Sequence, residues 1–250
     1  MIIEVDGVEF GYNSKPTLRD ITFSINEGDV LAKLGPNGVG KTTLLKCLNR
    51  ILKYSVGAVM VEGQDITLME KKQIARHMGY VPQRGDASRM TVFDSVLLGR
   101  KPHIDWDATK KDVRLAGRVI ELLGLEKLSL RSIDEISGGE YQLVQIARAL
   151  VQQPRIILLD EPTNSLDLRN QHAILGLIGK IVRMNQMAAI MTTHDLNLAI
   201  RYSNRFLLMK EGKILAAGGD EVITAETIKA AYDVDVVVEK VNGTHVVMPV

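Results

Sequence analysis

One stretch, residues 35–43, constrains the fold of this 250-residue chain more than any other. Its residues fit the phosphate-binding pattern G-x-x-x-x-G-K-[ST], and they are Gly35, Pro36, Asn37, Gly38, Val39, Gly40, Lys41, Thr42 and Thr43. The apolar run at residues 30–34 predicts a strand before it. The apolar spacing from Leu44 to Leu52 predicts an amphipathic helix after it. The pattern therefore lies where a strand passes through a glycine-rich turn into a helix.

This setting predicts a site for the phosphates of a nucleoside triphosphate. Glycines allow backbone N–H groups to turn inward around a polyphosphate, and a helix N-terminus adds partial positive charge. Lys41 would face the β and γ phosphates, and Thr42 would place a hydroxyl where Mg²⁺ would sit. A glycine-rich turn that binds nothing is the alternative, and the flanking strand and helix argue against it.

Composition excludes several other classes of protein. The net charge of +1 gives no field that would recruit nucleic acid or anionic lipid, and without a basic stripe we expect no nucleic-acid partner. The single cysteine, Cys47, allows no disulfide framework, suits a reducing cytoplasm and is expected in the core. We expect neither a signal peptide nor a membrane span, so another protein would have to anchor the chain at a membrane.

The hydrophobic pattern divides the chain into an α/β core and an inserted helical block. Strands and turns are expected over residues 1–34, whereas helical spacing dominates residues 84–153. One helix is expected from Thr109 to Leu123, with an apolar face formed by Val113, Ala116, Ile120 and Leu123. The apolar run Ile156–Leu159 predicts a parallel strand covered on both faces. We therefore expect one domain with a catalytic core at 1–83 and 154–218, a helical subdomain at 84–153, and a C-terminal helix and hairpin at 219–250.

Two further motifs carry chemistry. Asp160 and Glu161 follow an apolar strand, where Asp160 could hold Mg²⁺ through water and Glu161 could polarise the water that attacks the γ phosphate. Ser137, Gly138 and Gly139 open a helix and predict a second anion site. The alternatives are solvated acids at a strand end and a simple helix cap. One nucleotide does not obviously need two anion sites, so the second could serve a nucleotide bound mainly by another copy of the chain.

These motifs together resemble the ATP-binding-cassette (ABC) ATPases over residues 1 to about 218. The ordered set comprises residues 35–43, Gln83, Ser137–Glu140, Asp160-Glu161, Ser165-Leu166-Asp167 and His194. The resemblance implies a P-loop NTPase core of class α/β, with a mixed sheet and an N-terminal antiparallel β subdomain, that hydrolyses ATP with Mg²⁺. It also implies a head-to-tail dimer in which each ATP lies between one copy's phosphate loop and the other copy's signature helix, which begins at Ser137.

The same resemblance assigns roles to individual residues. The implied catalytic residues are Glu161, His194 and Gln83, and the implied metal ligands are Thr42, Gln83 and Asp160. The implied ATP-binding residues are Tyr12, which would stack on adenine, residues 35–43, Ser137, Gly138, Gly139, Glu140 and Asp167. The sequence departs from the family pattern at Ile136, Glu140 and Tyr141, where Leu, Gln and Arg are common. Lys33 interrupts an apolar strand, and we interpret it as a snorkelling side chain.

A narrower resemblance, carried by Val96–His103, Glu140 and Tyr232–Val236, is to importers of iron–siderophore, haem and vitamin B12 complexes, a subgroup that includes some molybdate-type importers. It implies multi-span membrane permease subunits, indirectly a substrate-binding protein, and a location on the cytoplasmic face of the cell membrane. A groove lined by residues 84–90 and 100–106, with Arg84 and Arg100 as coupling charges, would accept a short permease helix. A soluble scaffold for iron–sulfur cluster assembly and a ribosome-associated cassette protein stay as alternatives.

Overall fold

The computed structural model describes residues 1–13, 15–83, 89–164 and 166–250, and two sheets organise this part of the chain. The smaller sheet is antiparallel with the order β2-β1-β4-β5. The larger sheet has the order β10-β9-β3-β8-β7-β6 and is parallel except for β10. Its strands are β3 (Val30–Leu34), β6 (Met78–Val81), β7 (Ile156–Asp160), β8 (Ala188–Thr192), β9 (Arg205–Lys210) and β10 (Lys213–Gly218). Those of the smaller sheet are β1 (Ile3–Tyr12), β2 (Lys15–Ile25), β4 (Val56–Val61) and β5 (Gln64–Asp65).

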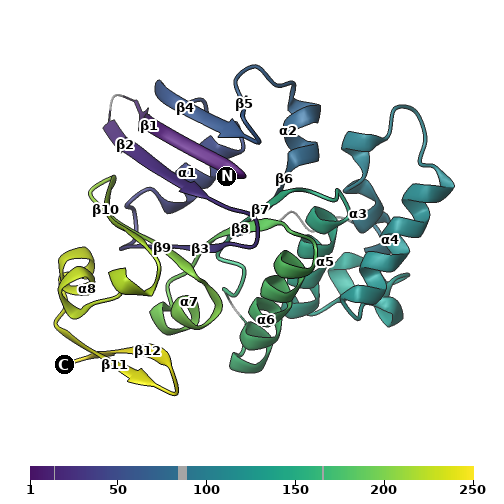
Figure 1. The fold of residues 1–250 in the computed structure, drawn as a ribbon. Coiled ribbons are helices and arrows are strands. Elements are labelled where there is room, and N and C mark those ends of the chain that lie inside the picture. The colour runs from purple at the N-terminus through teal and green to yellow at the C-terminus, as the bar shows by residue number, and fades with distance from the viewer. Residues whose placement is uncertain (14, 84–88, 165) are drawn as a thin grey trace.

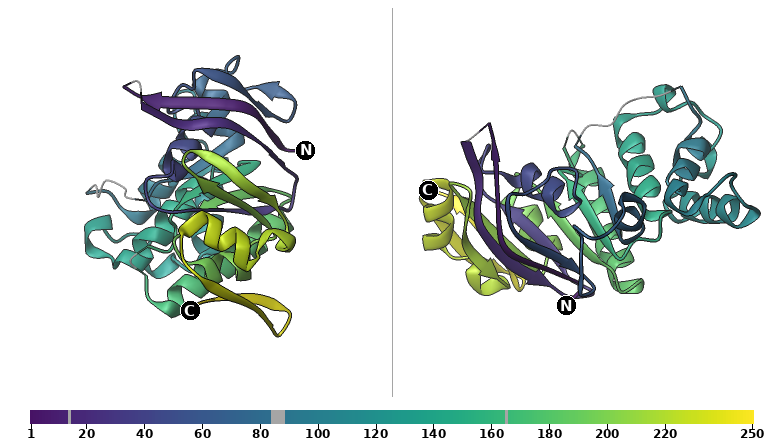
Figure 2. Two further views of the ribbon diagram at one scale, coloured as in Figure 1. Left: turned by 90° about the vertical axis from the view of Figure 1, so that its left-hand side faces the viewer. Right: turned by 90° about the horizontal axis from the view of Figure 1, so that it is seen from above.

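The helices divide into three groups around the sheets. Helix α1 (Lys41–Leu48) lies between the two sheets, and α6 (Leu168–Met184) and α7 (Leu196–Tyr202) cover the other face of the larger sheet (Figure 1). After α2 (Lys71–His77) and β6, the chain forms a separate helical block of α3 (Val92–Leu98), α4 (Lys110–Leu122) and α5 (Gly138–Leu150). Helix α8 (Ala225–Tyr232) and the hairpin β11 (Val236–Val241) and β12 (Thr244–Pro249) lie at the opposite side of the molecule (Figure 2).

The parallel strands are buried along their whole length because both faces of the larger sheet are covered. Successive side chains of a strand point to opposite faces. Thus Ile156 and Leu158 enter the core around α1, while Ile157 and Leu159 enter the core shared with α6 and the helical block. Every residue of β3, β7 and β8 is buried. The prediction of a parallel strand covered on both faces is confirmed, as is the α/β class.

Helix α1 is shorter than the apolar spacing predicted. It ends at Leu48, and Ile51, which we placed on its buried face, is 53% exposed. The cause is Arg50, whose φ of 51° turns the chain out of the helix. The Arg50 guanidinium donates to the carbonyl oxygens of Ile66 and Met69 at 3.1 and 2.6 Å, and these contacts hold the turn.

Helix α4 buries the predicted face at Ala116 and Ile120, and Leu123 just after it is also buried, but the first position of that face differs from prediction. Val113 is 43% exposed, whereas Asp112 is buried. The carboxylate of Asp112 forms an ion pair with Arg100 inside the helical block, and this pairing makes an aspartate acceptable at a core position. The hairpin expected near the C-terminus is present, and Asn242 and Gly243 form its turn: both have positive φ, 49° and 82°, as a two-residue hairpin turn requires.

Candidate active site

The phosphate-binding pattern forms the loop between β3 and α1. Gly35 and Gly40 are required there for two reasons, since both have positive φ and both lie against other strands. A Cβ at Gly35 would be 2.5 Å from the carbonyl oxygen of Met209 in β9, and one at Gly40 would be 2.8 Å from Leu18 Cδ2 in β2. The loop backbone is therefore packed closely against β9 at Gly35 and against β2 at Gly40. Helix α1 begins at Lys41, so the last three residues of the pattern form its first turn.

Lys41 extends back over this loop. Its Nζ donates to the carbonyl oxygens of Gly35 at 2.6 Å and Pro36 at 3.0 Å. Burial lowers the pKa of the Lys41 ammonium, and the negative charges of Glu161 and Asp160 oppose that shift. The Lys41 ammonium is therefore close enough to Asp160 and Glu161 to interact electrostatically with both carboxylates.

Asp160, the last residue of β7, is the centre of a hydroxyl network. Its Oδ1 accepts hydrogen bonds from Thr42 Oγ1 at 2.9 Å and from Thr192 Oγ1 at 2.8 Å, and its Oδ2 accepts from the Tyr80 hydroxyl at 3.4 Å. Burial and the neighbouring Asp160 carboxylate raise the pKa of Tyr80, so that this hydroxyl stays a donor. Asp160 is thereby fixed beside the first turn of α1, with oxygen atoms of the kind that Mg²⁺ prefers.

Glu161 follows directly and brings two distant segments together. Its Oε2 accepts a hydrogen bond from Gln83 Nε2 at 2.5 Å, and its Oε1 lies 2.5 Å from His194 Nε2. The backbone N–H of Glu161 donates to Thr192 Oγ1 at 2.9 Å, which anchors a residue whose φ of 52° is unusual for a side chain of this size. The three residues expected to be catalytic therefore converge at the carboxyl ends of β6, β7 and β8, where ligands of open α/β sheets bind.

Lys33 corrects our interpretation of the strand before the loop. It does not snorkel: it is fully buried, and its Nζ donates to the carbonyl oxygens of Gly40 at 3.5 Å and of Lys41. Desolvation holds the pKa of Lys33 well below its ordinary value of 10.5, although the nearby Asp160 carboxylate partly opposes that shift. The ammonium thus lies beneath the junction of loop and helix, where it contacts the backbone of the phosphate-binding pattern directly.

The remaining predicted ATP-binding residues lie further from this centre. Tyr12 is 46% exposed at the end of β1, where its ring packs edge-on against Phe10.

Ser137 caps α5, its Oγ donating to Glu140 Oε2 at 2.7 Å while Glu140 accepts from the Ser137 backbone N–H at 2.8 Å. These hydrogen bonds lower the pKa of Glu140. Asp167 caps α6 by accepting from the Asn170 N–H at 2.8 Å. Ser165, part of the same motif, lies outside the described residues.

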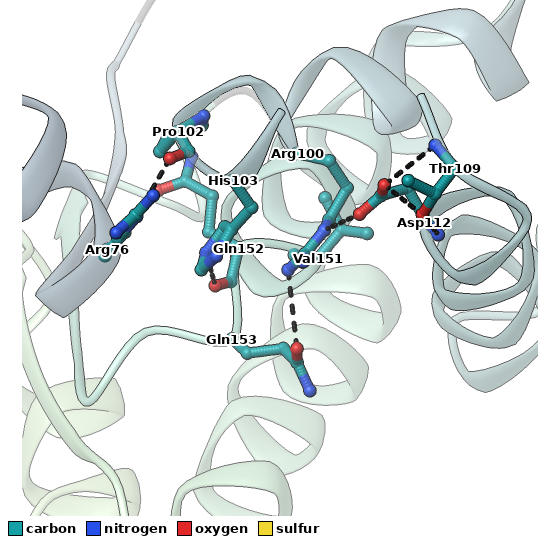
Figure 3. A network of polar contacts seen from close by, with 9 residues as sticks. All are labelled: Arg76, Arg100, Pro102, His103, Thr109, Asp112, Val151, Gln152 and Gln153. Atoms are coloured by element: carbon teal, nitrogen blue, oxygen red, sulfur yellow. Dashed lines mark hydrogen bonds and ion pairs between the residues drawn. The ribbon is translucent and has the colours of Figure 1, made fainter. Parts of the chain in front are cut away.

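Arg100 contradicts its predicted place in an exposed groove. It is only 4% exposed, and Figure 3 shows its guanidinium between Asp112, whose Oδ1 lies 2.9 Å from Nε, and the carbonyl oxygen of Val151 at 3.0 Å from Nη1. A side chain committed to an internal ion pair cannot also receive a partner. Trp106, in contrast, is 96% exposed, as a partner contact would require. Arg84 lies outside the described residues.

Sequence reasoning missed Thr192 and Tyr80, the two residues that fix Asp160. Thr192 is the last residue of β8, and its hydroxyl bridges Asp160 and the Glu161 N–H. A threonine at the end of an otherwise apolar strand was the available signal, since a buried hydroxyl must find a partner. Tyr80 lies in the short buried strand β6 next to β7, and its aromatic character alone predicted packing rather than a hydrogen bond.

Comparisons with known proteins agree with this geometry. The family model described as ABC transporter matches residues 18–164, more than half of the chain. The chain belongs to the ABC transporter family. It is 51% identical over 250 residues to an uncharacterized ABC transporter ATP-binding protein of Methanocaldococcus jannaschii, covering 100% of this chain and 98% of that protein. It is 35% identical to the iron(3+)-hydroxamate import ATP-binding protein of Bacillus subtilis, covering 93% and 88%.

A solved structure of a metal-chelate type ABC transporter in an inward-facing conformation matches the fold with a TM-score of 0.87. That match has 30% sequence identity and covers 100% of this chain and 97% of the other. The protein is thus an ATP-binding ABC ATPase. Among the similar structures, cbiO1 of Clostridium perfringens is part of the ABC transporter complex cbiONQ. Among the described residues of this chain, no helix is both long and apolar enough to cross a bilayer.

Proposed function

We propose that this chain is the ATP-hydrolysing subunit of an importer for a metal chelate, of the iron–siderophore, haem, cobalamin or molybdate type. The observation that carries the hydrolytic role is the convergence of Gln83 and His194 on the two carboxylate oxygens of Glu161. The importer role is supported by the iron(3+)-hydroxamate import protein and the metal-chelate type transporter among the similar proteins. In this role the chain would work on the cytoplasmic face of the membrane, bound to multi-span permease subunits and, through them, to a substrate-binding protein.

ATP would bind with its phosphates in the loop of residues 35–43. The backbone N–H groups of a glycine-rich loop and the N-terminus of α1 suit an anion, and Lys41 can exchange its contacts with the carbonyl oxygens of Gly35 and Pro36 for the β and γ phosphates. The half-exposed ring of Tyr12 offers a flat surface for adenine. Tyr12 ends β1, which forms a hairpin with β2. The hairpin lies beside the phosphate loop, because Leu18 of β2 is next to Gly40.

Magnesium fits the same site by the chemistry of its donors. Thr42 Oγ1 and Asp160 Oδ1 are 2.9 Å apart at the start of α1, and Mg²⁺ takes one or two such protein oxygens together with waters and substrate phosphates. Gln83 would supply a third oxygen. When bound, the ion would neutralise the charge that develops on the phosphate oxygens. The hydroxyl groups of Thr192 and Tyr80 would keep Asp160 in position.

Hydrolysis would use Glu161 as the general base. The carboxylate takes a proton from water as the water oxygen bonds to the γ phosphorus, and the bond from that phosphorus to the β–γ bridging oxygen breaks. ADP leaves with the electron pair of the broken bond, and the proton stays on Glu161. Gln83 and His194 hold the two carboxylate oxygens, and His194 would turn toward the γ phosphate when ATP is present.

The second anion site would complete the nucleotide pocket across a head-to-tail homodimer. Ser137 and the amides of Gly138 and Gly139 lie at the N-terminus of α5, whose 13 residues supply a substantial dipole. Asp167, at the start of α6, would communicate between the two pockets. In this chain Glu140 holds the Ser137 hydroxyl, so phosphate binding would require that hydroxyl to change its hydrogen-bond partner.

Purification of the tagged chain from detergent-solubilised membranes tests the importer assignment. We expect a multi-span membrane protein to co-purify at a fixed ratio, and the complex in vesicles to accumulate one of the four chelate classes when ATP is supplied. The Glu161→Gln complex should assemble but not transport. If the chain instead purifies only with soluble partners of cluster assembly, it is a scaffold ATPase and the importer assignment is wrong.

A further inference from the structure

The C-terminal segment, residues 219–250, reaches the active site although it lies outside the matched family region of residues 18–164. It contains α8 and the hairpin β11–β12, at the side of the molecule away from the helical block (Figures 1 and 2). Buried residues of this segment, among them Ile228, Ala231 and Val247, belong to the same core as α6 and α7. The segment is therefore packed into the cassette, and polar contacts with the phosphate loop, β9 and α7 fix its position.

The first of these contacts is made by Tyr232, the last residue of α8. Its hydroxyl accepts a hydrogen bond from the backbone N–H of Gly35, at 2.8 Å. Gly35 is buried and is the first residue of the phosphate loop. A buried backbone N–H must be paired, and Tyr232 supplies the acceptor for this one.

Tyr232 is itself held in place from β9. Lys210, the residue after Met209, donates through Nζ to the carbonyl oxygen of Ala230 and to Asp233 Oδ1, each at 2.7 Å. Asp233 ends the helix in a left-handed conformation with φ of 58°. A lysine at the last carbonyls of a helix complements the helix dipole. The end of α8 is thus fastened to the strand that pairs with β3, which leads into the phosphate loop.

A second contact ties the segment to the helix behind His194. Asn197 donates through Nδ2 to the Val247 carbonyl oxygen at 3.2 Å and accepts from the Val247 N–H at 2.9 Å. Asn197 is the second residue of α7, three positions after His194. The Asn197 side chain thus pairs with both the N–H and the carbonyl oxygen of Val247, as a neighbouring strand would. These two bonds fix the position of the hairpin along α7.

We infer that Tyr232 is a positioning residue for the phosphate loop, and that the C-terminal segment braces the loop through it. The two peptide groups that flank Gly35 are held from different sides: its N–H by Tyr232 and its carbonyl oxygen by Lys41. When the Lys41 ammonium turns to the phosphates of ATP, the Tyr232 contact remains and keeps the loop open for them. This inference rests on the proposed role of residues 35–43 in binding ATP.

The variant Tyr232→Phe isolates the hydroxyl, because it keeps the ring that packs against the core. Without an acceptor, the Gly35 N–H should draw the loop into other conformations, and ATP would have to restore the binding geometry. We expect the KM for ATP to rise about fivefold or more, the lower end of what an unpaired buried group costs. The kcat should change less than about twofold, since Glu161, Gln83 and His194 are untouched.

Tyr202→Phe is the matched control. Tyr202 is the last residue of α7, and its hydroxyl contacts Nδ1 of His172 in α6 at 2.7 Å, so the substitution also removes one hydrogen-bonded phenol oxygen close to the C-terminal segment. We expect a similar loss of thermal stability with an unchanged KM. A third variant, Asn197→Ala, loosens the hairpin without touching the loop. If the segment acts as one brace, its effect on KM should be smaller than that of Tyr232→Phe and not additive with it.

The outcomes separate this inference from the proposed role of the loop. Should Tyr232→Phe lower the Tm as much as Tyr202→Phe while both keep the parental KM, Tyr232 is a packing residue and the inference is wrong. Lys41→Ala is measured in parallel by ATP titration. If that variant binds ATP as tightly as the parent, the loop assignment itself fails, whatever Tyr232→Phe does.

Discussion

At the scale of single residues, Lys33 makes the stability of the protein depend on pH. Its ammonium is fully buried, and desolvation lowers its pKa well below 10.5, so between the folded pKa and 10.5 the unfolded chain binds more protons than the folded chain. Stability should therefore rise with pH in this window, by up to about 1.4 kcal/mol per pH unit. The charged neighbours of Lys33 are Asp160, Lys41 and, when ionised, Cys47.

Urea unfolding of the parent and of Lys33→Met between pH 7 and 9 checks this prediction. Methionine retains the length of the side chain without a titrating group. We expect the parent to gain stability relative to the variant as pH rises. The range stops at pH 9 because the buried Cys47 thiol, whose pKa is raised to about 12, would otherwise add an opposite trend. Parallel curves for the two proteins would show that Lys33 stays protonated in the folded state throughout this range, so that burial does not lower its pKa as far as the prediction requires.

The second residue-scale prediction concerns Glu161. Glu161→Gln should bind ATP as the parent does and lose turnover by about 100-fold or more, since an amide cannot accept the proton of the attacking water. Glu62→Gln is a suitable control, because Glu62 contacts Arg155 and His77 away from the phosphate loop. Phosphate release and ATP binding are measured on the same preparations. Turnover of Glu161→Gln near the parental rate would remove Glu161 from the role of base.

Residue-scale contacts divide into those that a sequence can reveal and those that it cannot. Asp160, Glu161 and the phosphate loop lie within recognisable local patterns, and Gln83 and His194 were found through resemblance to a family. The burial of Lys33 was not predictable, because a charged residue in an apolar strand is ordinarily expected to reach solvent. Tyr232 and Gly35 are 197 positions apart, and no local pattern connects them.

At the scale of secondary structure elements, the strands were easier to predict than the first turn of helix α4. Apolar runs identify β3 and β7 because parallel strands are covered on both faces. In α4, the predicted face is buried except at its start, where Asp112 takes the core position expected for Val113. An aspartate is expected at the surface unless its partner is known. That partner, Arg100, is 12 positions earlier in another element, so helical periodicity alone could not reveal the pair.

The Arg100–Asp112 pair should stabilise the helical block rather than couple it to a membrane subunit. Removing one partner of a buried ion pair leaves the other uncompensated, so Arg100→Met should lower the free energy of unfolding by about 3–5 kcal/mol. Replacing both residues, as Arg100→Met with Asp112→Leu, should recover part of that loss. Urea unfolding measures both. An Arg100→Met protein as stable as the parent would contradict the role of the pair.

The Asp112 carboxylate adds a pH signature to the same helix. Its hydrogen bonds with Thr109 and its contact with Arg100 lower its pKa from 3.8 to about 2. A depressed pKa contributes stability that is present above about pH 4 and is lost as pH falls toward 2. This part of the acid sensitivity should be missing in the double variant, which separates the ion pair from the other carboxylates of the chain.

At the scale of the whole molecule, the proposed dimer makes a prediction that no single chain can satisfy. If Ser137 contacts ATP held by the other copy, its defect must act in trans. Mixing Ser137→Arg with Lys41→Ala chains creates dimers with one site damaged twice and the other intact. ATPase activity should reappear in the mixture, provided that one intact site suffices, while each variant alone stays inactive.

Mixing Lys41→Ala with Glu161→Gln supplies the control, because both residues act on the ATP bound by their own chain. Every site of such a mixed dimer retains one defect, so no activity should return. Native mass spectrometry in the presence of ATP establishes that mixed dimers form in both experiments. If they form and the Ser137→Arg mixture stays inactive while its intact site binds ATP, or if the control mixture recovers, the two halves of the site do not come from different copies. The geometry gives a reason to expect the first result: α5 presents Ser137 in the helical block, whereas Lys41 and Glu161 lie together at the ends of the core strands.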